Sequence, residues 1–425
     1  MTDLALGIDI GTTGVRIAAT ERDANIVAMS DAVIAAPLLD FGRRLQDPQI
    51  WWEAVETALN TLLDRIDRSC VKSIAIDGTS GTILPVAGDG EPLGLASMYD
   101  DYAEASDLAR VTASAPADSA ARGGSSPLAR ALVLQQTTHL ARIIHQADWI
   151  AGQFSDRFDV TDENNALKTG YDPVARQWPS WIAATGMSVK YLPSVVPAGT
   201  RVATITADAA AKFDLPEDTA IVAGTTDGCA AFLASGASAP GDGVTSLGTT
   251  LTLKLLSSSP VFAPQYGIYS HRIGDAWLAG GASNSGGQAI MAHFSRDEVE
   301  RLTPLIDPGK PTGLDFYPLA RPGERFPIND PNFAPRLEPR PSEPQRFLQA
   351  ILEGVAGVEA LGYRRLAELG ANPLATIRTV GGGAVNDKWT EIRLKALGVP
   401  ARPAASPHAC AGVARLAWRG IDAAP

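Results

Sequence analysis

The chain has 425 residues, of which 45% are hydrophobic and 20% are charged, a globular composition with enough length for two domains. Its net charge of −11 argues against nucleic acid or an anionic membrane as a partner. The three cysteines are far apart and indicate a reducing compartment without disulfides. No basic leader and no run of about 18 apolar residues is seen, so we expect a cytoplasmic protein. We also expect the protein to be a monomer or a homodimer.

The first 36 residues predict three strands, at 4–10, 14–20 and 25–34, because short β-rich apolar runs alternate with turn residues. The first two strands are joined by Gly-Thr-Thr-Gly, and Asp9 lies just before that turn. A hairpin needs its turn but not a carboxylate at this place. Asp9 is therefore a candidate functional residue.

The segment that follows predicts an α/β domain. A helix is expected over 47–66, with Asp47 as its cap and proline in its first turn. A buried strand over 71–78 ends in Asp-Gly, and a hairpin is expected over 82–94. Residues 104–190 read as mainly helical.

The middle of the chain repeats the opening pattern. A strand runs into a small-residue helix near Gly228, and "SLGTTLTLKLL" at 246–256 then resembles "DIGTTGVRIAA". Gly11 and Gly248 are 237 positions apart (248 − 11). Two unrelated hairpins can share a tripeptide, but the similar flanking strands favour an internal duplication. The expected domains are 1–236 and 237–425.

The last third predicts a long surface loop region, a strong helix and another glycine turn. The loop region covers 304–345, which is rich in proline and arginine, and the helix covers 342–370. A strand, "GGG" and a helix start follow within 376–398. Turns of glycine and threonine expose N–H groups and hydroxyls that cradle phosphate. Since neither common phosphate fingerprint is found, these turns predict a nucleotide site of another kind.

Five stretches, in this order, resemble the FGGY carbohydrate kinases: "GIDIGTTGVR", "AIVAGTTDGCAAFLASGA", "GDGVTSLGTT", "FLQAILEGVAG" and "VGGGAVNDKWTEIRLKALGVP". The resemblance covers nearly the whole chain. It implies an α/β fold of two duplicated actin-like (RNase H-like) ATPase domains with a catalytic cleft between them. It also implies an enzyme that uses ATP and Mg²⁺ to phosphorylate an alcohol group of a small-molecule sugar, with no nucleic-acid or membrane partner.

The resemblance also implies roles for individual residues. Asp227 would be the general base, although a carboxylate there is also a helix N-cap. Asp9 would bind Mg²⁺, directly or through water, and lie beside the substrate; capping the turn is its alternative role. The residues implied for the phosphates and the adenosine of ATP are Gly11, Thr12, Thr13, Gly248, Thr249, Gly382, Gly383, Ala384 and Asn386.

For the sugar, the resemblance points to "DGTSG" at 77–81 and "MYDDYA" at 98–103, with Thr79, Ser80, Asp101 and Asp227 as substrate-binding residues. Family xylulokinases typically have Met-His near the first stretch, and many members have Asn-Asp-x-Arg at the second, where this chain has Ala103. The first stretch is more similar to short D-ribulose kinases of cyanobacteria and plants. Alternatively, Asp100 or Asp101 is a solvated hairpin exit.

We therefore expect a ketopentose kinase that favours D-ribulose, with D-xylulose or another polyol as the alternative substrate. Two hypotheses belong to other classes: a non-catalytic ATP-dependent switch with the actin-like fold, and a sugar-binding regulator. The presence of both Asp9 and Asp227 argues against the regulator.

Overall fold

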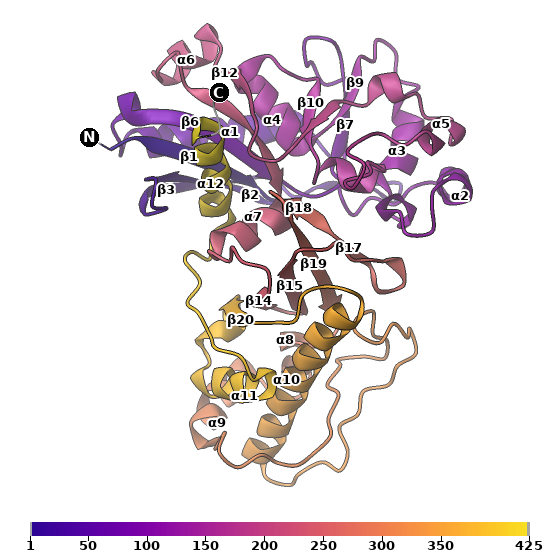
Figure 1. The fold of residues 1–425 in the computed structure, drawn as a ribbon, viewed down its shortest axis with the longest axis vertical. Helices are drawn as coiled ribbons and strands as arrows, with labels where there is room; N and C mark the ends of the chain where they lie inside the picture. Colours follow the sequence, from indigo (N-terminus) through magenta and orange to yellow (C-terminus); the bar gives the residue numbers. More distant parts are fainter. Residues whose placement is uncertain (1, 423–425) are drawn as a thin grey trace. The chain divides into compact units, whose positions relative to one another are not determined.

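The computed structural model describes residues 2–422 and divides into two units (Figure 1). Unit 1 comprises the residues up to Ala234, the short segment His271–Gly274 and the residues from His408 on. Unit 2 comprises Ser235–Ser270 and Asp275–Pro407. The chain thus returns twice to unit 1, which a single division of the sequence at 236/237 does not describe.

A six-stranded sheet of order β12-β13-β6-β1-β2-β3 organises unit 1. Strands β13, β6 and β1 are mutually parallel, whereas β1, β2 and β3 are antiparallel. The three expected N-terminal strands and the strand at 71–78 are confirmed. The strands are β1 (Leu4–Ile10), β2 (Gly14–Thr20), β3 (Ile26–Val33), β6 (Val71–Gly78), β12 (Arg201–Thr204) and β13 (Ala220–Thr226).

Two apolar layers cover the two faces of this sheet, because successive side chains of a strand point to opposite faces. Leu6 and Ile8 of β1 belong to the layer that contains α1 and α4, whereas Ala5 belongs to the layer of α7 and α12. The helices of unit 1 are α1 (Pro48–Leu63), α2 (Ala105–Ser114), α3 (Pro127–Leu134), α4 (Gln146–Ser155), α5 (Trp181–Ala184), α6 (Ala207–Phe213), α7 (Asp227–Ala234) and α12 (Ala409–Asp422).

Helix α1 begins as predicted but ends earlier. The Asp47 side chain accepts a hydrogen bond from the Gln49 N–H, and Pro48 occupies the first turn. The helix stops at Leu63 rather than at residue 66. The start is set by a local cap, whereas the end depends on packing.

A second sheet of unit 1, of order β4-β5-β8-β7-β9, packs with α2 and α3. The expectation of a mainly helical segment over 104–190 was incomplete, because β9 and β10 lie within it. Both strands are too short for periodicity to distinguish them from helix. The remaining strands of unit 1 are β4 (Leu38–Asp40), β5 (Arg43–Gln46), β7 (Ile83–Val86), β8 (Ala96–Ser97), β9 (Arg142–His145), β10 (Val160–Asp162), β11 (Ser194–Val196) and β18 (His271–Ile273).

Unit 2 repeats the strand pattern of unit 1. Its β14 and β15 form an antiparallel hairpin, β15 pairs antiparallel with β19, and β14 pairs parallel with β20. In unit 1, β3-β2-β1-β6 pair in the same way as β19-β15-β14-β20: the first two neighbouring pairs are antiparallel and the third is parallel. The predicted duplication requires such a match. The strands are β14 (Asp242–Leu247), β15 (Leu251–Ser257), β16 (Phe262–Ala263), β17 (Ile268–Tyr269), β19 (Ala276–Ser283) and β20 (Thr376–Val380).

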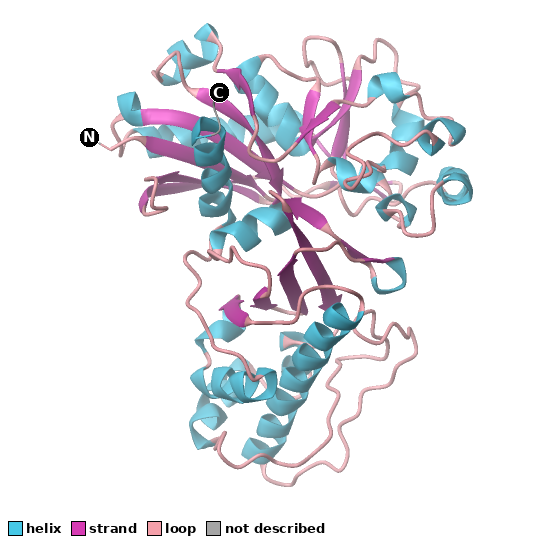
Figure 2. Cartoon of the chain, in the orientation of Figure 1, coloured by secondary structure: helices cyan, strands magenta, loops and turns pink. Residues whose placement is uncertain are grey.

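The helices of unit 2 are α8 (Gly287–Met291), α9 (Arg296–Leu302), α10 (Pro344–Glu368) and α11 (Asp387–Leu397). Figure 2 shows the segment between α9 and α10 almost entirely as loop, as expected. The segment is not confined to the surface, however, because Phe316, Tyr317, Leu319 and Phe326 are buried. Aromatic side chains can fill a core without belonging to a periodic element, so the sequence pattern missed them.

The structure gives the state of the cysteines and the apolar character of the helices. All three cysteines are buried and free. Among residues 2–422, no helix combines the length and the apolar character that a membrane crossing needs.

Candidate active site

Three carboxyl groups of unit 1 lie at the carboxyl ends of neighbouring parallel strands. Asp9 of β1 is directly opposite Asp77 of β6, and Asp77 is opposite Thr225 of β13. Asp227 follows the end of β13 as the first residue of α7. The strand neighbours of Asp9 and Asp77, such as Ile8 and Ile76, point into the apolar layer that contains α1. Because successive side chains of a strand point to opposite faces, the two carboxyl groups project on the other face, which α7 and α12 cover.

Burial dominates the electrostatics of this group. It raises the pKa of Asp9; the adjacent Asp77 carboxyl opposes the rise, and the negative charge of Asp227 adds to it. The pKa of Asp77 lies well above its usual range, first because the side chain is fully buried and then because Asp9 is adjacent. Of the two carboxyl groups, Asp77 therefore has the more strongly raised pKa.

The C-terminal helix α12 supports both strand ends. A Cβ atom on Gly412 would lie 1.9 Å from the carbonyl oxygen of Ala230 in α7, and one on Gly7 would lie 1.9 Å from the carbonyl oxygen of Cys410. Glycine at both positions lets α12 approach β1 and α7, which carry Asp9 and Asp227. Sequence reasoning missed this support; the small-residue run in α12 is the only local signal for it.

The donor set of this site fits Mg²⁺. Mg²⁺ is usually bound by one or two carboxylates and keeps several waters, and Asp9 and Asp227 are near enough for their negative charges to interact. A cation would relieve that repulsion. No cluster of three or more His, Cys, Asp or Glu side chains suited to a metal is found in the described part of the chain, so the fit rests on this pair and on water.

The predicted phosphate turn of unit 1 is a well-bonded hairpin loop. The Gly11 N–H donates to the Gly14 carbonyl at 2.9 Å, and Gln46 Nε2 donates to the Thr12 carbonyl at 3.2 Å. Thr13 is exposed and Thr12 is partly exposed. The loop is thus fixed in position while its threonine side chains reach the surface.

The predicted sugar-binding turn places its two hydroxyl residues differently. Thr79 is engaged, since its N–H and its Oγ1 donate to Gln146 Oε1 at 3.0 and 2.8 Å. The Oγ of Ser80 has no hydrogen-bond partner among residues 2–422. Of the two hydroxyls, only that of Ser80 is thus unpaired, and it is buried. Sugar contact by either residue stays a prediction.

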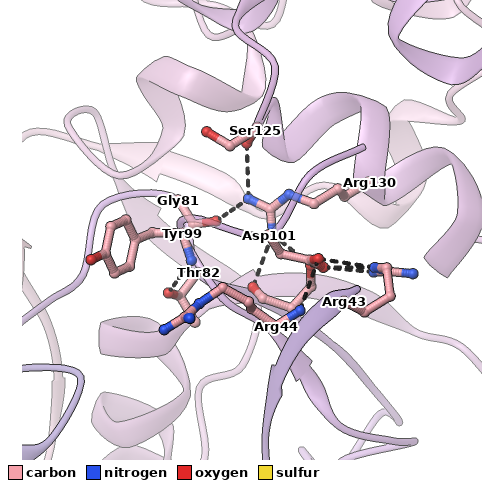
Figure 3. Close-up of polar contacts among 9 residues, drawn as sticks. Arg43, Arg44, Gly81, Thr82, Tyr99, Asp101, Ser125 and Arg130 are labelled. Carbon is pink, nitrogen blue, oxygen red and sulfur yellow. Dashed lines mark hydrogen bonds and ion pairs between the residues drawn. The ribbon is translucent and has the colours of Figure 1, made fainter. Parts of the chain in front are cut away.

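Asp101 is fully buried, so the alternative of a solvated hairpin exit is wrong for this residue. Its oxygens accept hydrogen bonds from Arg43, from the Arg44 N–H and from Ser97 Oγ (Figure 3). Burial alone would raise the pKa of Asp101, but these bonds outweigh it and the pKa is lowered. A guanidinium does reach Asp101, from Arg43 in β5 instead of from position 103. Direct sugar binding by Asp101 stays a prediction.

Unit 2 contains a cavity of about 890 Å³, a size typical of small-molecule sites. It brings together five residues predicted to bind nucleotide, namely Gly248, Thr249, Gly382, Gly383 and Asn386; Ala384 is not part of the lining. Sequence reasoning missed the other polar residues of the lining because it predicted neither α8 nor α9. These residues are Gln288, Arg296, Glu300 and Thr303.

Two elements shape the wall of this cavity. The turn after β20 becomes a 3₁₀ helix, Gly382–Val385, and α11 follows it. The Asn386 side chain caps α11 by accepting from the Trp389 N–H at 2.9 Å, and its amide donates to Thr303 Oγ1 at 3.3 Å. Ile290, Val299 and Leu352 add apolar surface. The cavity lining therefore combines apolar side chains with a few polar groups.

Comparison with known families gives two matches. Residues 4–113 match the model of the FGGY family of carbohydrate kinases, N-terminal domain, and residues 243–421 match that of the C-terminal domain. Together they cover well over half of the chain and include Asp9, Asp77 and the cavity described above, whereas Asp227 lies between the two matched ranges.

Several curated proteins are similar to the chain over most of its length. A xylulose kinase of Staphylococcus epidermidis is 20% identical over 414 residues, covering 92% of this chain and 82% of that protein. A gluconokinase of Bacillus subtilis is 21% identical, with 92% and 82% covered. A ribulokinase of Anoxybacillus flavithermus is 25% identical over 300 residues, with 60% and 53% covered.

Solved structures show the same fold. A structure titled xyloylose kinase from Brucella ovis has a TM-score of 0.86 and 21% identity, covering 99% of this chain and 91% of that one. Xylulose kinase from Rhodospirillum rubrum has a TM-score of 0.84 and 20% identity, with 98% and 89% covered. The predicted actin-like α/β fold is confirmed.

Proposed function

Because the chain belongs to the FGGY family of carbohydrate kinases, we propose that it transfers the γ-phosphoryl group of ATP, with Mg²⁺, to a hydroxyl of a ketopentose. The observation that carries this proposal is the placement of Asp9 and Asp227 at the carboxyl ends of β1 and β13, which flank β6 in the parallel part of the unit 1 sheet. The expected cytoplasmic location and the monomeric or homodimeric state stay predictions.

Asp227 is the base in this reaction. The acceptor hydroxyl oxygen bonds to the γ-phosphorus, the bond from phosphorus to the ADP oxygen breaks, and the hydroxyl proton passes to Asp227. The Gly228 N–H donates to Asp227 Oδ1 at 2.6 Å at the start of α7. Hydrogen bonding to the charged form and the positive end of the helix dipole both favour an ionised carboxylate, as a base requires.

Nucleotide binding is assigned to the cavity of unit 2. Its apolar lining suits an adenine ring, and Gly248 and Thr249 at its edge suit phosphate. Bound Mg²⁺, held by Asp9 and water, would offset the negative charge of the phosphates.

We favour D-ribulose as the acceptor because the turn at Thr79–Gly81 has small side chains and because Ser80 Oγ is an unpaired polar atom in it. D-ribulose and D-xylulose differ only in configuration at C3, and a site that hydrogen-bonds a hydroxyl rejects the wrong epimer strongly. D-xylulose is the second candidate, since relatives similar over most of the chain are named xylulose kinase.

A coupled ADP-release assay over D-ribulose, D-xylulose, gluconate, glycerol and aldopentoses tests the proposal, with Asp227→Asn as the inactive control. We expect kcat/KM for D-ribulose to exceed that for D-xylulose by at least about tenfold, or ~1.4 kcal/mol. Ser80→Ala should narrow this ratio more than it lowers sugar-independent ATP hydrolysis. Equal use of both ketopentoses, or better use of glycerol or gluconate, would overturn the substrate assignment; ADP release with none of them would overturn the ketopentose proposal.

A further inference from the structure

Buried polar groups hold the turn Thr79–Thr82 from several sides. Gln146 Oε1 accepts from Thr79, as described above, and the Gln146 N–H donates to the Thr82 carbonyl at 3.2 Å. Lys168 Nζ donates to the Ser80 carbonyl at 3.3 Å, and Arg130 donates to the Gly81 carbonyl at 2.6 Å. Three successive carbonyls are thus bonded from outside the turn, which fixes the direction of the Ser80 side chain.

Arg130 makes the shortest of these contacts and is 2% exposed. Among residues 2–422, its guanidinium bonds only neutral acceptors: the Gly81 and Ser125 carbonyls (Figure 3), and the carbonyl and Oγ of Ser97. Burial lowers the pKa of Arg130 to about 10, so it remains charged at neutral pH. Since burying a cation without a carboxylate contact is costly, stability alone is a poor reason for an arginine at this place.

Arg130 also connects the two stretches that the sequence assigned to the sugar. It donates to Ser97 Oγ at 2.6 Å, and Ser97 Oγ donates to Asp101 Oδ2 at 2.6 Å. Asp101 is in turn held by Arg43. The chain of bonds therefore runs from Arg43 through Asp101, Ser97 and Arg130 to the Gly81 carbonyl.

We propose that Arg130 is a positioning residue for acceptor recognition, which holds the turn bearing Ser80 in place and couples it to Asp101. The inference rests on the proposed function, in which this turn contacts the sugar. A misplacement of about 1 Å in a positioning group can lower a rate by roughly 10²-fold. Loss of the Gly81 contact should therefore impair sugar recognition more than it impairs nucleotide binding.

Arg130→Lys and Arg130→Met test the proposal, with Arg122→Met as the matched control. Arg122 lies in the same unit and donates to two carbonyls, those of Thr112 and Ala115, at 2.7 and 2.8 Å, but it does not bond the turn. Amide hydrogen exchange of the peptide containing Thr79–Thr82 measures the turn directly and needs no substrate. We expect faster exchange there in both Arg130 variants and unchanged exchange there in the control.

Kinetics on the best acceptor supply the second measurement. For Arg130→Lys we expect the acceptor KM to rise by about tenfold, with the ATP KM within about twofold of wild type. We also expect the ratio of kcat/KM for D-ribulose to kcat/KM for D-xylulose to shrink. Unchanged exchange in the turn, or equal changes in both KM values, would overturn the positioning role. Failure of every sugar as acceptor would overturn the ketopentose proposal instead, while the exchange result would still decide whether Arg130 holds the turn.

Discussion

The hairpin β1–β2 with β6 and the hairpin β14–β15 with β20 share one strand arrangement and carry different chemistry. Asp9 lies two residues before Gly11 and opposite Asp77. At the corresponding place of unit 2, Ser246 lies two residues before Gly248 and opposite Val380. A pair of carboxyl groups in unit 1 is thus replaced by a hydroxyl and an isopropyl group.

Under the proposed function, this difference gives the two units different tasks. Carboxylates at the strand ends of unit 1 can bind a cation and accept a proton. The neutral strand ends of unit 2 border a cavity with an apolar lining, where an anionic wall would repel phosphate. The same backbone frame supports either role, and a few side chains at strand ends decide which.

The largest effect should come from Asp227→Ala, which removes the proton acceptor and leaves unit 2 intact. We expect kcat to fall by ~10²–10⁴-fold, measured as sugar-dependent ADP release. Nucleotide affinity, measured by calorimetry, should stay within about twofold. Turnover within threefold of wild type would remove Asp227 from the mechanism. It would also contradict the idea that unit 1 supplies the proton acceptor while unit 2 binds the nucleotide.

Asp9→Asn should reduce the rate by about 10²-fold and shift the Mg²⁺ titration to higher concentration, because one metal-binding carboxylate is lost. Asp31→Asn is the matched control, since Asp31 is an exposed acid in β3 of the same sheet. An unchanged Mg²⁺ titration in the Asp9 variant would make Asp9 structural.

Gly382→Leu should produce the opposite pattern and raise the ATP KM by about tenfold while the sugar KM stays near wild type. Gly382 lines the cavity, and a Cβ there would meet no atom within 4 Å, so the added side chain can enter the site without a backbone clash. Gly357→Leu, at an equally open and exposed position on α10, is the control. An unchanged ATP KM for Gly382→Leu would place the nucleotide elsewhere.

The smallest effect concerns buried acids that differ between the units. Burial, and then the charge of Asp148, raises the pKa of Asp162 in unit 1 to about 7, whereas Glu359 in unit 2 pairs with Arg393 at 2.6 Å. A raised carboxyl pKa favours the protonated folded state, so its stabilising effect is complete below the unfolded value of about 3.9 and is lost as pH rises through 7.

Asp162→Asn should therefore gain stability relative to wild type between pH 5 and pH 8. The Tm of the variant and of wild type is measured at pH 5 and at pH 8. We expect the Tm difference between them to change by a few degrees in favour of the variant. Asp31→Asn again serves as the control and should show no such pH dependence. A relative stability that does not change between pH 5 and pH 8 would show that Asp162 is already ionised in the folded protein at pH 5.

Local chemistry in the sequence determined much of the fold. The β1–β2 and β14–β15 hairpins, the Asp47 cap of α1 and the start of α7 at Asp227 are all encoded within a few neighbouring residues. Strand alternation, a cap or a glycine turn needs no distant partner to be recognised. The order of these motifs was also enough to predict the family.

Tertiary structure alone decided which distant groups meet. The return of α12 to unit 1 depends on close approach at Gly7 and Gly412, and the pairing of Asp9 with Asp77 depends on the register of β1 and β6. The guanidinium that holds Asp101 comes from Arg43, 58 positions away. Such contacts form because folding buries polar groups that must then find partners, and no local period in the sequence specifies which partners those will be.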